Sequence, residues 1–181
     1  MASGLFRSIL VPHDFSRQAT AALETASDLA AEHHGTLILL HAIPPVYPLT
    51  TFGAEPELPV WSPPKELIAE ARARLEKIAA GAQKRRGIRG VTCRVLIGEP
   101  YRCILEAARA ADSIVMATLS RTGLSHLLMG SVAERVVRQA TVPVLTIRVP
   151  EAGRKRRGAK RTPRRRSAAP ASRGRARTRR R

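Results

Sequence analysis

The sequence predicts an α/β fold, a five-stranded parallel sheet with helices on both faces, and two observations support this prediction. Short apolar runs alternate along residues 1–149 with segments whose apolar residues recur at helical spacing. This alternation is typical of parallel strands joined by right-handed helical crossovers, which place helices on both sides of the sheet. Three of the five strands are apolar throughout, as strands covered on both faces are. We therefore expect one domain over residues 1–149.

The first unit is a buried strand over residues 9–11, a turn over residues 13–16, and a helix. Ser16 is the predicted N-cap of this helix, because its hydroxyl can accept a bond from a free N–H group. Gly35 is expected to take the left-handed conformation that commonly ends a helix. The helix itself is predicted from six apolar positions at helical spacing: Ala19, Ala22, Leu23, Ala26, Leu29 and Ala30.

A second buried strand is predicted over residues 37–40, and an irregular segment rich in proline and aromatic residues follows at 43–62. A loop of this length inside a compact domain is usually functional or disordered, and we expect it to pack over another part of the domain. Ser62 and Pro63 are predicted as the N-cap and first residue of the next helix, which ends near Gly87. Its apolar positions are Leu67, Ala71, Leu75, Ile78 and Ala82.

The second half of the domain repeats the same alternation. Residues 91–97 alternate apolar and polar side chains, which indicates a strand with one wetter face. A helix follows from Pro100, and then a fully apolar strand over residues 114–116. Ser131 is the predicted N-cap of the next helix, and residues 142–149 form the last strand. The apolar face of that helix is predicted to hold Val132, Ala133, Val136, Val137 and Ala140.

The apolar strands belong in the centre of the sheet and the alternating ones at its edges. This predicts a Rossmann-like sheet with the spatial order 3-2-1-4-5, whose winding direction reverses between strands one and four. Ligands bind at such a reversal, beyond the carboxyl ends of the strands. Pro12, His13 and Asp14 follow strand one, and residues 117–120 follow strand four, so we expect both segments at a ligand site. Asp14 has a structural alternative, an Asx-turn or a cap ahead of the first helix.

A helix is predicted to begin at Gly130 and Ser131, and the free N–H groups of its first turn form an anion-binding site. A strand and a loop of small and hydroxyl residues precede it, which suggests a phosphate-binding loop. The alternative is a purely structural unit, because strand–loop–helix joins with Gly and Ser are common and most bind nothing.

Residues 113–131 resemble the signature loop of the universal stress protein family, Gly-x2-Gly-x9-Gly-[Ser/Thr]. Gly130 and Ser131 match its final pair, whereas Ala117 and Ser120 stand where the family has its first two glycines. Flanking segments match too, so the resemblance covers nearly all of residues 5–149. These segments are Ile-Leu-Val-Pro-His-Asp-Phe-Ser, Leu-Leu-His-Ala, Gly-Ser-Val-Ala-Glu-Arg-Val and Val-Pro-Val-Leu-Thr-Ile-Arg. The resemblance implies the same strand order, in a fold like that of the adenine nucleotide alpha hydrolases.

The resemblance also implies a site for ATP or a related adenine nucleotide, with Mg²⁺ accompanying the phosphates. Asp14 and Ala42 would frame the adenine, and positions 117, 120, 130 and 131 the ribose and phosphates. A homodimer formed through the last strand and a regulatory role in the stress response are implied as well. The residues expected at the nucleotide are Pro12, Asp14, Ala42, Met116, Ala117, Ser120, Arg121, Gly130, Ser131 and Val132.

The two replaced glycines affect the expected affinity. If position 120 needs a left-handed conformation, Ser costs about 1–2 kcal/mol there relative to Gly. A helix N-terminus stabilises an anion by about 0.3–1 kcal/mol, and by about 2 kcal/mol when partly buried. Ser120 and Arg121 could also bond phosphate directly. Because these contributions are comparable, we expect nucleotide binding that is retained but weakened.

Other functional classes find little support in the sequence. Neither Gly-x4-Gly-Lys-[Ser/Thr] nor Gly-x-Gly-x-x-Gly occurs, and the five histidines and two cysteines lack paired metal-ligand spacing. No nucleophile–base set can be assembled, so we expect no enzyme, with weak ATP hydrolysis as the alternative. Cys93 and Cys103 are expected to pack as small apolar groups. The free cysteines and the lack of a secretion signal at the start predict a cytoplasmic location.

The charge of the chain is concentrated at its end. The formal net charge is +18, and residues 151–181 hold fifteen Lys or Arg and one acidic residue, which leaves +4 for residues 1–150. Residues 150–181 are therefore expected to form a disordered tail. Residues 154–181 would bind the phosphate backbone of DNA or RNA without reading sequence, or another polyanion such as polyphosphate or an anionic membrane surface. The alternatives are an inert solubilising tail, or a stress protein that binds nucleic acid and no nucleotide.

Overall fold

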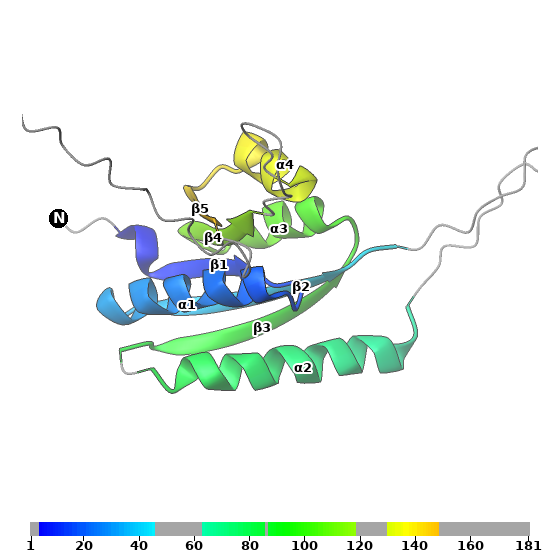
Figure 1. Ribbon diagram of the computed structural model, residues 1–181, viewed down its shortest axis with the longest axis horizontal. Helices are drawn as coiled ribbons and strands as arrows, with labels where there is room; N and C mark the ends of the chain where they lie inside the picture. Colours follow the sequence, from blue (N-terminus) through cyan, green and yellow to red (C-terminus); the bar gives the residue numbers. More distant parts are fainter. Residues whose placement is uncertain (1–3, 46–62, 86, 119–129, 149–181) are drawn as a thin grey trace, which may run out of the picture. The chain divides into compact units, whose positions relative to one another are not determined.

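The computed structural model describes residues 4–45, 63–85, 87–118 and 130–148. A 3-10 turn precedes five strands that alternate with four helices (Figure 1). In chain order the elements are η1 (Gly4–Phe6), β1 (Ser8–Pro12), α1 (Arg17–Glu32), β2 (Thr36–Ile43), α2 (Lys65–Gln83), β3 (Gly90–Ile97), α3 (Pro100–Ala108), β4 (Ser113–Thr118), α4 (Ser131–Gln139) and β5 (Val144–Arg148).

The strands form one sheet with the order β3-β2-β1-β4-β5, and every neighbouring pair is parallel. Leu10 lies at the centre, paired with Ile38 of β2 on one side and Ile114 of β4 on the other. The predicted fold class and strand order are confirmed. They follow because the strands without polar residues can be placed only where helices cover both faces.

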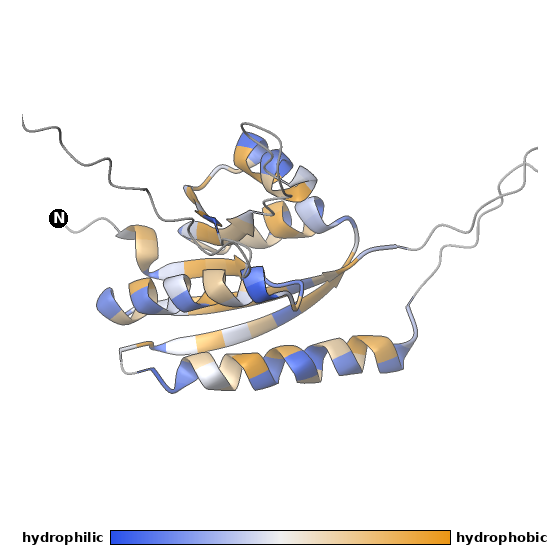
Figure 2. Cartoon of the chain, viewed as in Figure 1, coloured by the Kyte–Doolittle hydropathy of each residue, from blue (hydrophilic) through white to orange (hydrophobic). Residues whose placement is uncertain are grey.

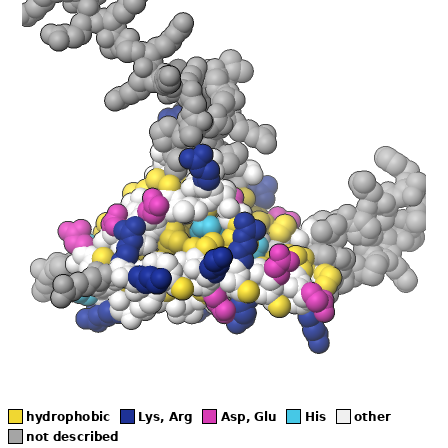
Figure 3. All heavy atoms as spheres, turned by 60° about the horizontal axis from the view of Figure 1, so that its bottom comes forward, with side chains coloured by type: hydrophobic (Ala, Val, Ile, Leu, Met, Phe, Trp, Pro, Cys, Tyr) yellow, Lys and Arg dark blue, Asp and Glu magenta, His cyan; other side chains and the backbone are white. Residues whose placement is uncertain are grey.

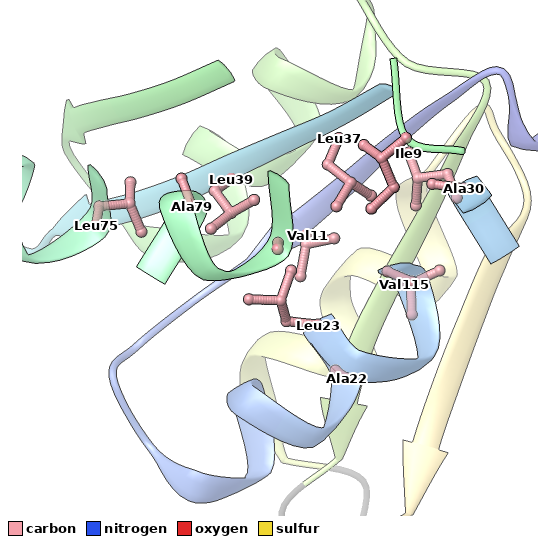
Figure 4. Close-up of a cluster of buried hydrophobic side chains, with 13 residues drawn as sticks. Ile9, Val11, Ala22, Leu23, Ala30, Leu37, Leu39, Leu75, Ala79 and Val115 are labelled. Atoms are coloured by element: carbon pink, nitrogen blue, oxygen red, sulfur yellow. The ribbon is translucent and has the colours of Figure 1, made fainter. Parts of the chain in front are cut away.

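Each face of the sheet has its own hydrophobic cluster. α1 and α2 cover the face that carries Ile9 and Val11, whereas α3 and α4 cover the face that carries Leu10 and Ile114. Figure 4 shows the first cluster, in which Leu23 of α1 points toward the strands. Figure 2 shows the matching pattern of hydropathy, with hydrophobic strands and helices that are hydrophilic along one side. This separation follows from the alternation of side chains along β1.

The end of α1 differs from the prediction. His34, and not Gly35, has the positive φ, at 52°. The N–H of Gly35 donates to the carbonyl of Ala30 at 2.7 Å, which completes the hydrogen-bonded loop that commonly ends a helix. Gly35 is buried, and a Cβ there would collide with the carbonyl oxygen of Phe6. Glycine is therefore needed at this position for close backbone approach and not for its φ.

Two predicted helix starts are wrong by one or two residues. α2 is capped by Pro64 and begins at Lys65, with no side-chain cap bond, so Pro63 lies before the helix. α4 is capped by the backbone of Gly130, so Ser131 is its first helical residue and not its cap. A sequence supplies the residue types that favour caps, but backbone geometry decides which of two neighbours takes the position.

Several predicted boundaries and faces also change. β2 extends to Ile43, so that Ala42 belongs to the strand, and β5 is shorter than the predicted strand over residues 142–149. Leu67 of α2 and Val137 of α4 were predicted on buried faces but are 41% and 43% exposed. Both helices bury few of their residues, which are Ala71, Leu75, Ala79 and Ala82 in α2 and Ala133 and Val136 in α4.

Some predictions fall outside the described residues. These are the contacts of the segment at 46–62, the residue Ser62 itself, whose predicted capping position Pro64 takes, the loop residues Ser120 and Arg121, and the tail at 150–181. Within the described ranges, no helix is long and apolar enough to cross a membrane.

Candidate functional site

A pocket of about 730 Å³ lies at the carboxyl ends of the central strands. Its walls come from the turn after β1, the ends of β2 and β4, and the first residues of α1, α3 and α4. This is the place where the direction of winding reverses, as the strand order predicts. Eight of the ten residues predicted at a nucleotide line it: Pro12, Asp14, Ala42, Met116, Ala117, Gly130, Ser131 and Val132.

The turn after β1 is held by its own side chains. Phe15 has a φ of 64°, a left-handed conformation that is unfavourable for a bulky residue. Its N–H donates to Nδ1 of His13 at 3.0 Å, and the N–H of Ser16 donates to Oδ1 of Asp14 at 3.0 Å. Oγ of Ser16 in turn accepts from the N–H of Ala19 at 3.1 Å. The predicted N-cap and the Asx-turn of Asp14 are therefore both present, and three side-chain acceptors hold the turn around the strained Phe15.

His13 lines the pocket within the segment expected there, although it is not among the ten residues predicted to contact a nucleotide. It is 3% exposed, and its backbone N–H donates to the carbonyl of Leu40 at 2.7 Å. Because Nδ1 accepts from Phe15, the neutral imidazole carries its proton on Nε2, which has no hydrogen-bond partner among the described residues. Burial lowers the pKa of His13, and the nearby Asp14 carboxylate only partly opposes this. The available indication in the sequence was a polar residue directly after a buried strand, next to Asp14.

A second layer of side chains supports the turn. Nδ1–H of His41 donates to the carbonyl oxygen of His13 at 2.8 Å, which joins β2 to the turn. The rings of His41 and Phe15 have centroids 4.3 Å apart. The guanidinium of Arg74, from α2, lies over the ring of Phe15, with its Cζ 4.3 Å from the ring centroid. This layer orders the pocket wall before any ligand arrives.

The N-terminus of α4 forms another part of the pocket wall. Gly130 has an extended conformation (φ −58°, ψ 151°), and its carbonyl accepts the first intrahelical bond, from Glu134 at 2.9 Å. The N–H groups of Ser131, Val132 and Ala133 therefore have no acceptor within the helix. All three residues line the pocket, where such groups together with the helix dipole favour an anion.

The charge of the pocket wall is low. Among the described residues that line it, Asp14 is the only acidic one and none is Lys or Arg. Most of the others are apolar, so the wall suits a flat, uncharged group, with one place for an anion at α4. The outer face shown in Figure 3, by contrast, has acidic and basic side chains interspersed.

The two cysteines lie away from this pocket. Cys103 is buried in α3 and Cys93 is partly buried in β3, and burial raises the pKa of both thiols. They behave as the predicted small apolar groups, because a raised pKa keeps a thiol protonated and unreactive. Within the described part of the chain, no three His, Cys, Asp or Glu residues are grouped so as to hold a metal ion.

Known proteins are similar to this chain over nearly all of the domain. The model of the universal stress protein family matches residues 5–148. A universal stress protein of Methanocaldococcus jannaschii is 33% identical over 150 residues, which are 81% of this chain and 85% of that protein.

Two solved structures have the same fold. A universal stress protein in complex with cAMP is 22% identical, with a TM-score of 0.55 over 80% of this chain and 98% of the other. The universal stress protein of Archaeoglobus fulgidus in complex with dAMP is 24% identical, with a TM-score of 0.55 over 79% and 98%. The family match over residues 5–148 and the 33% identity to a universal stress protein show that the chain belongs to the universal stress protein family.

Proposed function

We propose that this protein is a regulatory module that binds ATP or a related adenine nucleotide in the pocket between β1 and β4. The observation that carries the proposal is the meeting of Asp14 and Ala42 with the free N–H groups of α4 in one pocket. An apolar wall suits an adenine base and ribose, and the start of α4 suits a phosphate. The structures of two family members with cAMP and dAMP support this choice of ligand.

The proposal extends to residues outside the described part of the chain. Ser120 would donate its hydroxyl to a phosphate, and Arg121 would pair with one. Mg²⁺ would enter with the phosphates, because the described residues offer no ligand cluster of their own. We also propose that binding, and not catalysis, is the function, in a cytoplasmic setting that the two free cysteines support.

Gly130→Val is expected to weaken nucleotide binding at least tenfold. The branched side chain would enter the pocket wall beside the N–H groups of α4, which the phosphate needs. Isothermal calorimetry with ATP-Mg, AMP and uncharged adenosine measures this, since adenosine is not attracted by the basic tail. Gly81→Val is the control, because a Cβ at Gly81 meets nothing within 4 Å and α2 lies outside the pocket at that point. Wild-type protein that binds none of the three ligands would refute the proposal.

We propose that two chains form a homodimer through β5. This strand is at the edge of the sheet, and Leu145 on it is 40% exposed. Leu145→Lys is expected to raise the dimer dissociation constant at least tenfold, because the interface would have to desolvate an unpaired charge. Sedimentation over a concentration series measures it, with Leu67→Lys on α2 as a control of equal exposure. A wild-type monomer, or equal effects of the two substitutions, would contradict the proposal.

We propose that residues 154–181 bind nucleic acid without sequence preference, because they carry many Lys and Arg residues and no acidic residue. Removing all residues after Pro150 is expected to abolish binding to a DNA duplex. If 6–10 phosphates are contacted, affinity of the full chain should fall about 10³–10⁵-fold between 50 and 200 mM salt. Electrophoretic mobility shifts at several salt concentrations test both. Polyphosphate and anionic vesicles as competitors separate DNA binding from a general attraction to anions. DNA binding that survives the truncation, or whose affinity does not change with salt concentration, would show that the tail is not the DNA-binding segment.

A further inference from the structure

We propose that Nε2–H of His13 donates a hydrogen bond to a ring nitrogen of the bound base, which makes His13 a specificity-determining residue of the pocket. This inference rests on the proposed function, because the base it recognises is that of the bound nucleotide. It starts from one unusual group in a residue that lines the pocket: Nε2 of His13 is buried and has no acceptor among the described residues.

The two nitrogens of His13 have separate roles. Nδ1 accepts from the N–H of Phe15 and so holds the strained turn, which requires that Nδ1 carry no proton. The proton of the neutral ring is then on Nε2, and Nε2 contributes nothing to the turn. Burial lowers the pKa of His13, which keeps its ring neutral near pH 7. The charged or titratable groups around the ring are Asp14, His41 and Arg74.

A buried donor without a hydrogen-bond partner raises the free energy of the protein, and an acceptor supplied by a ligand removes this penalty. The loss of one hydrogen bond to an uncharged partner typically changes an equilibrium about tenfold. The structure around His13 favours a heteroaromatic nitrogen over a phosphate as this acceptor. Leu40 and Met116 provide apolar surface at the same pocket, and the carboxylate of Asp14 next to His13 repels an anion. The anion belongs instead at the start of α4.

Two substitutions separate the two nitrogens. His13→Asn places an amide oxygen near the position of Nδ1, so it can still accept from Phe15, but it has no group at the position of Nε2. His13→Gln reaches the position of Nε2 with an N–H donor and loses the acceptor of the turn. If His13 only stabilises the turn, Asn should preserve ligand binding better than Gln. If His13 binds the base, Gln should preserve ligand binding better than Asn.

The experiment uses the full chain and calorimetric titration with adenosine and its 1-, 3- and 7-deaza analogues, each of which lacks one ring nitrogen. Wild type is expected to lose about tenfold in affinity for one analogue only. His13→Asn should lose about tenfold for adenosine and show no further loss for that analogue, whereas His13→Gln should bind adenosine within about threefold of wild type. Thermal melting should show the reverse order, with Asn the more stable variant.

The outcomes are distinguishable. Adenosine binding by wild type that is unchanged in His13→Asn overturns this inference and leaves the proposed function intact. No adenosine binding by wild type overturns both. Should either variant fail to fold, nitrogen-15 NMR of wild type decides: the Nε2–H resonance of His13 must shift downfield with adenosine and not with the one weak analogue. An unchanged resonance overturns the inference.

Discussion

Gly35→Ala is expected to lower the free energy of unfolding by about 3 kcal/mol or more, at the upper end for an overpacked site. The added Cβ would collide with the carbonyl oxygen of Phe6 and lie 3.1 Å from that of Arg7, and both are backbone atoms. Gly35 cannot move aside without loss, because its N–H donates to Ala30 at 2.7 Å and its carbonyl accepts from Arg89 at 2.8 Å. Urea-induced unfolding measures the change.

Gly90→Ala is the matched control for this prediction. Gly90 begins the neighbouring strand β3, pairs with Thr36, and would place its Cβ 4.0 Å from the Cγ2 of that residue. This is an ordinary contact, and the change should lie within about 1 kcal/mol of zero, since Ala also restricts the unfolded chain. Equal urea midpoints for Gly35→Ala and Gly90→Ala would contradict the assigned role of Gly35.

Ala42→Trp is expected to reduce the affinity for adenosine or AMP at least 100-fold. Ala42 lies near the carboxyl end of β2 and lines the pocket. An indole at this position would fill space in a pocket of about 730 Å³. Accommodating a ligand beside it costs about 3 kcal/mol or more, at the upper end for overpacking, which corresponds to at least 100-fold in affinity. Calorimetric titration measures the affinity, and thermal melting shows whether the variant is folded.

Thr92→Trp provides the comparison for Ala42→Trp. Thr92 is an exposed residue of β3 that does not line the pocket, so the same indole should leave the affinity unchanged. A folded Ala42→Trp protein with undiminished affinity would mean that the nucleotide binds elsewhere on the chain.

The sequence by itself determined the fold and the location of the pocket. The apolar strands around Leu10, Leu39 and Ile114 can be placed only in the middle of a sheet covered on both sides, and this placement alone fixes where the winding reverses. The same reasoning brought Asp14 and Ala117 together, although they are far apart in the chain. Periodicity and strand order are collective properties of many residues, so single errors do not change them.

Only the tertiary structure decided the roles of particular residues. Gly35 is required by the backbone of Phe6, not by its own φ, and the cap of α4 is Gly130, not Ser131. The burial of His13 and the unpartnered state of its Nε2 among the described residues depend on β2 and on the packing around the pocket. Such features are set by distances between segments remote in sequence. Local residue preferences, each about 1 kcal/mol or less, cannot specify those distances.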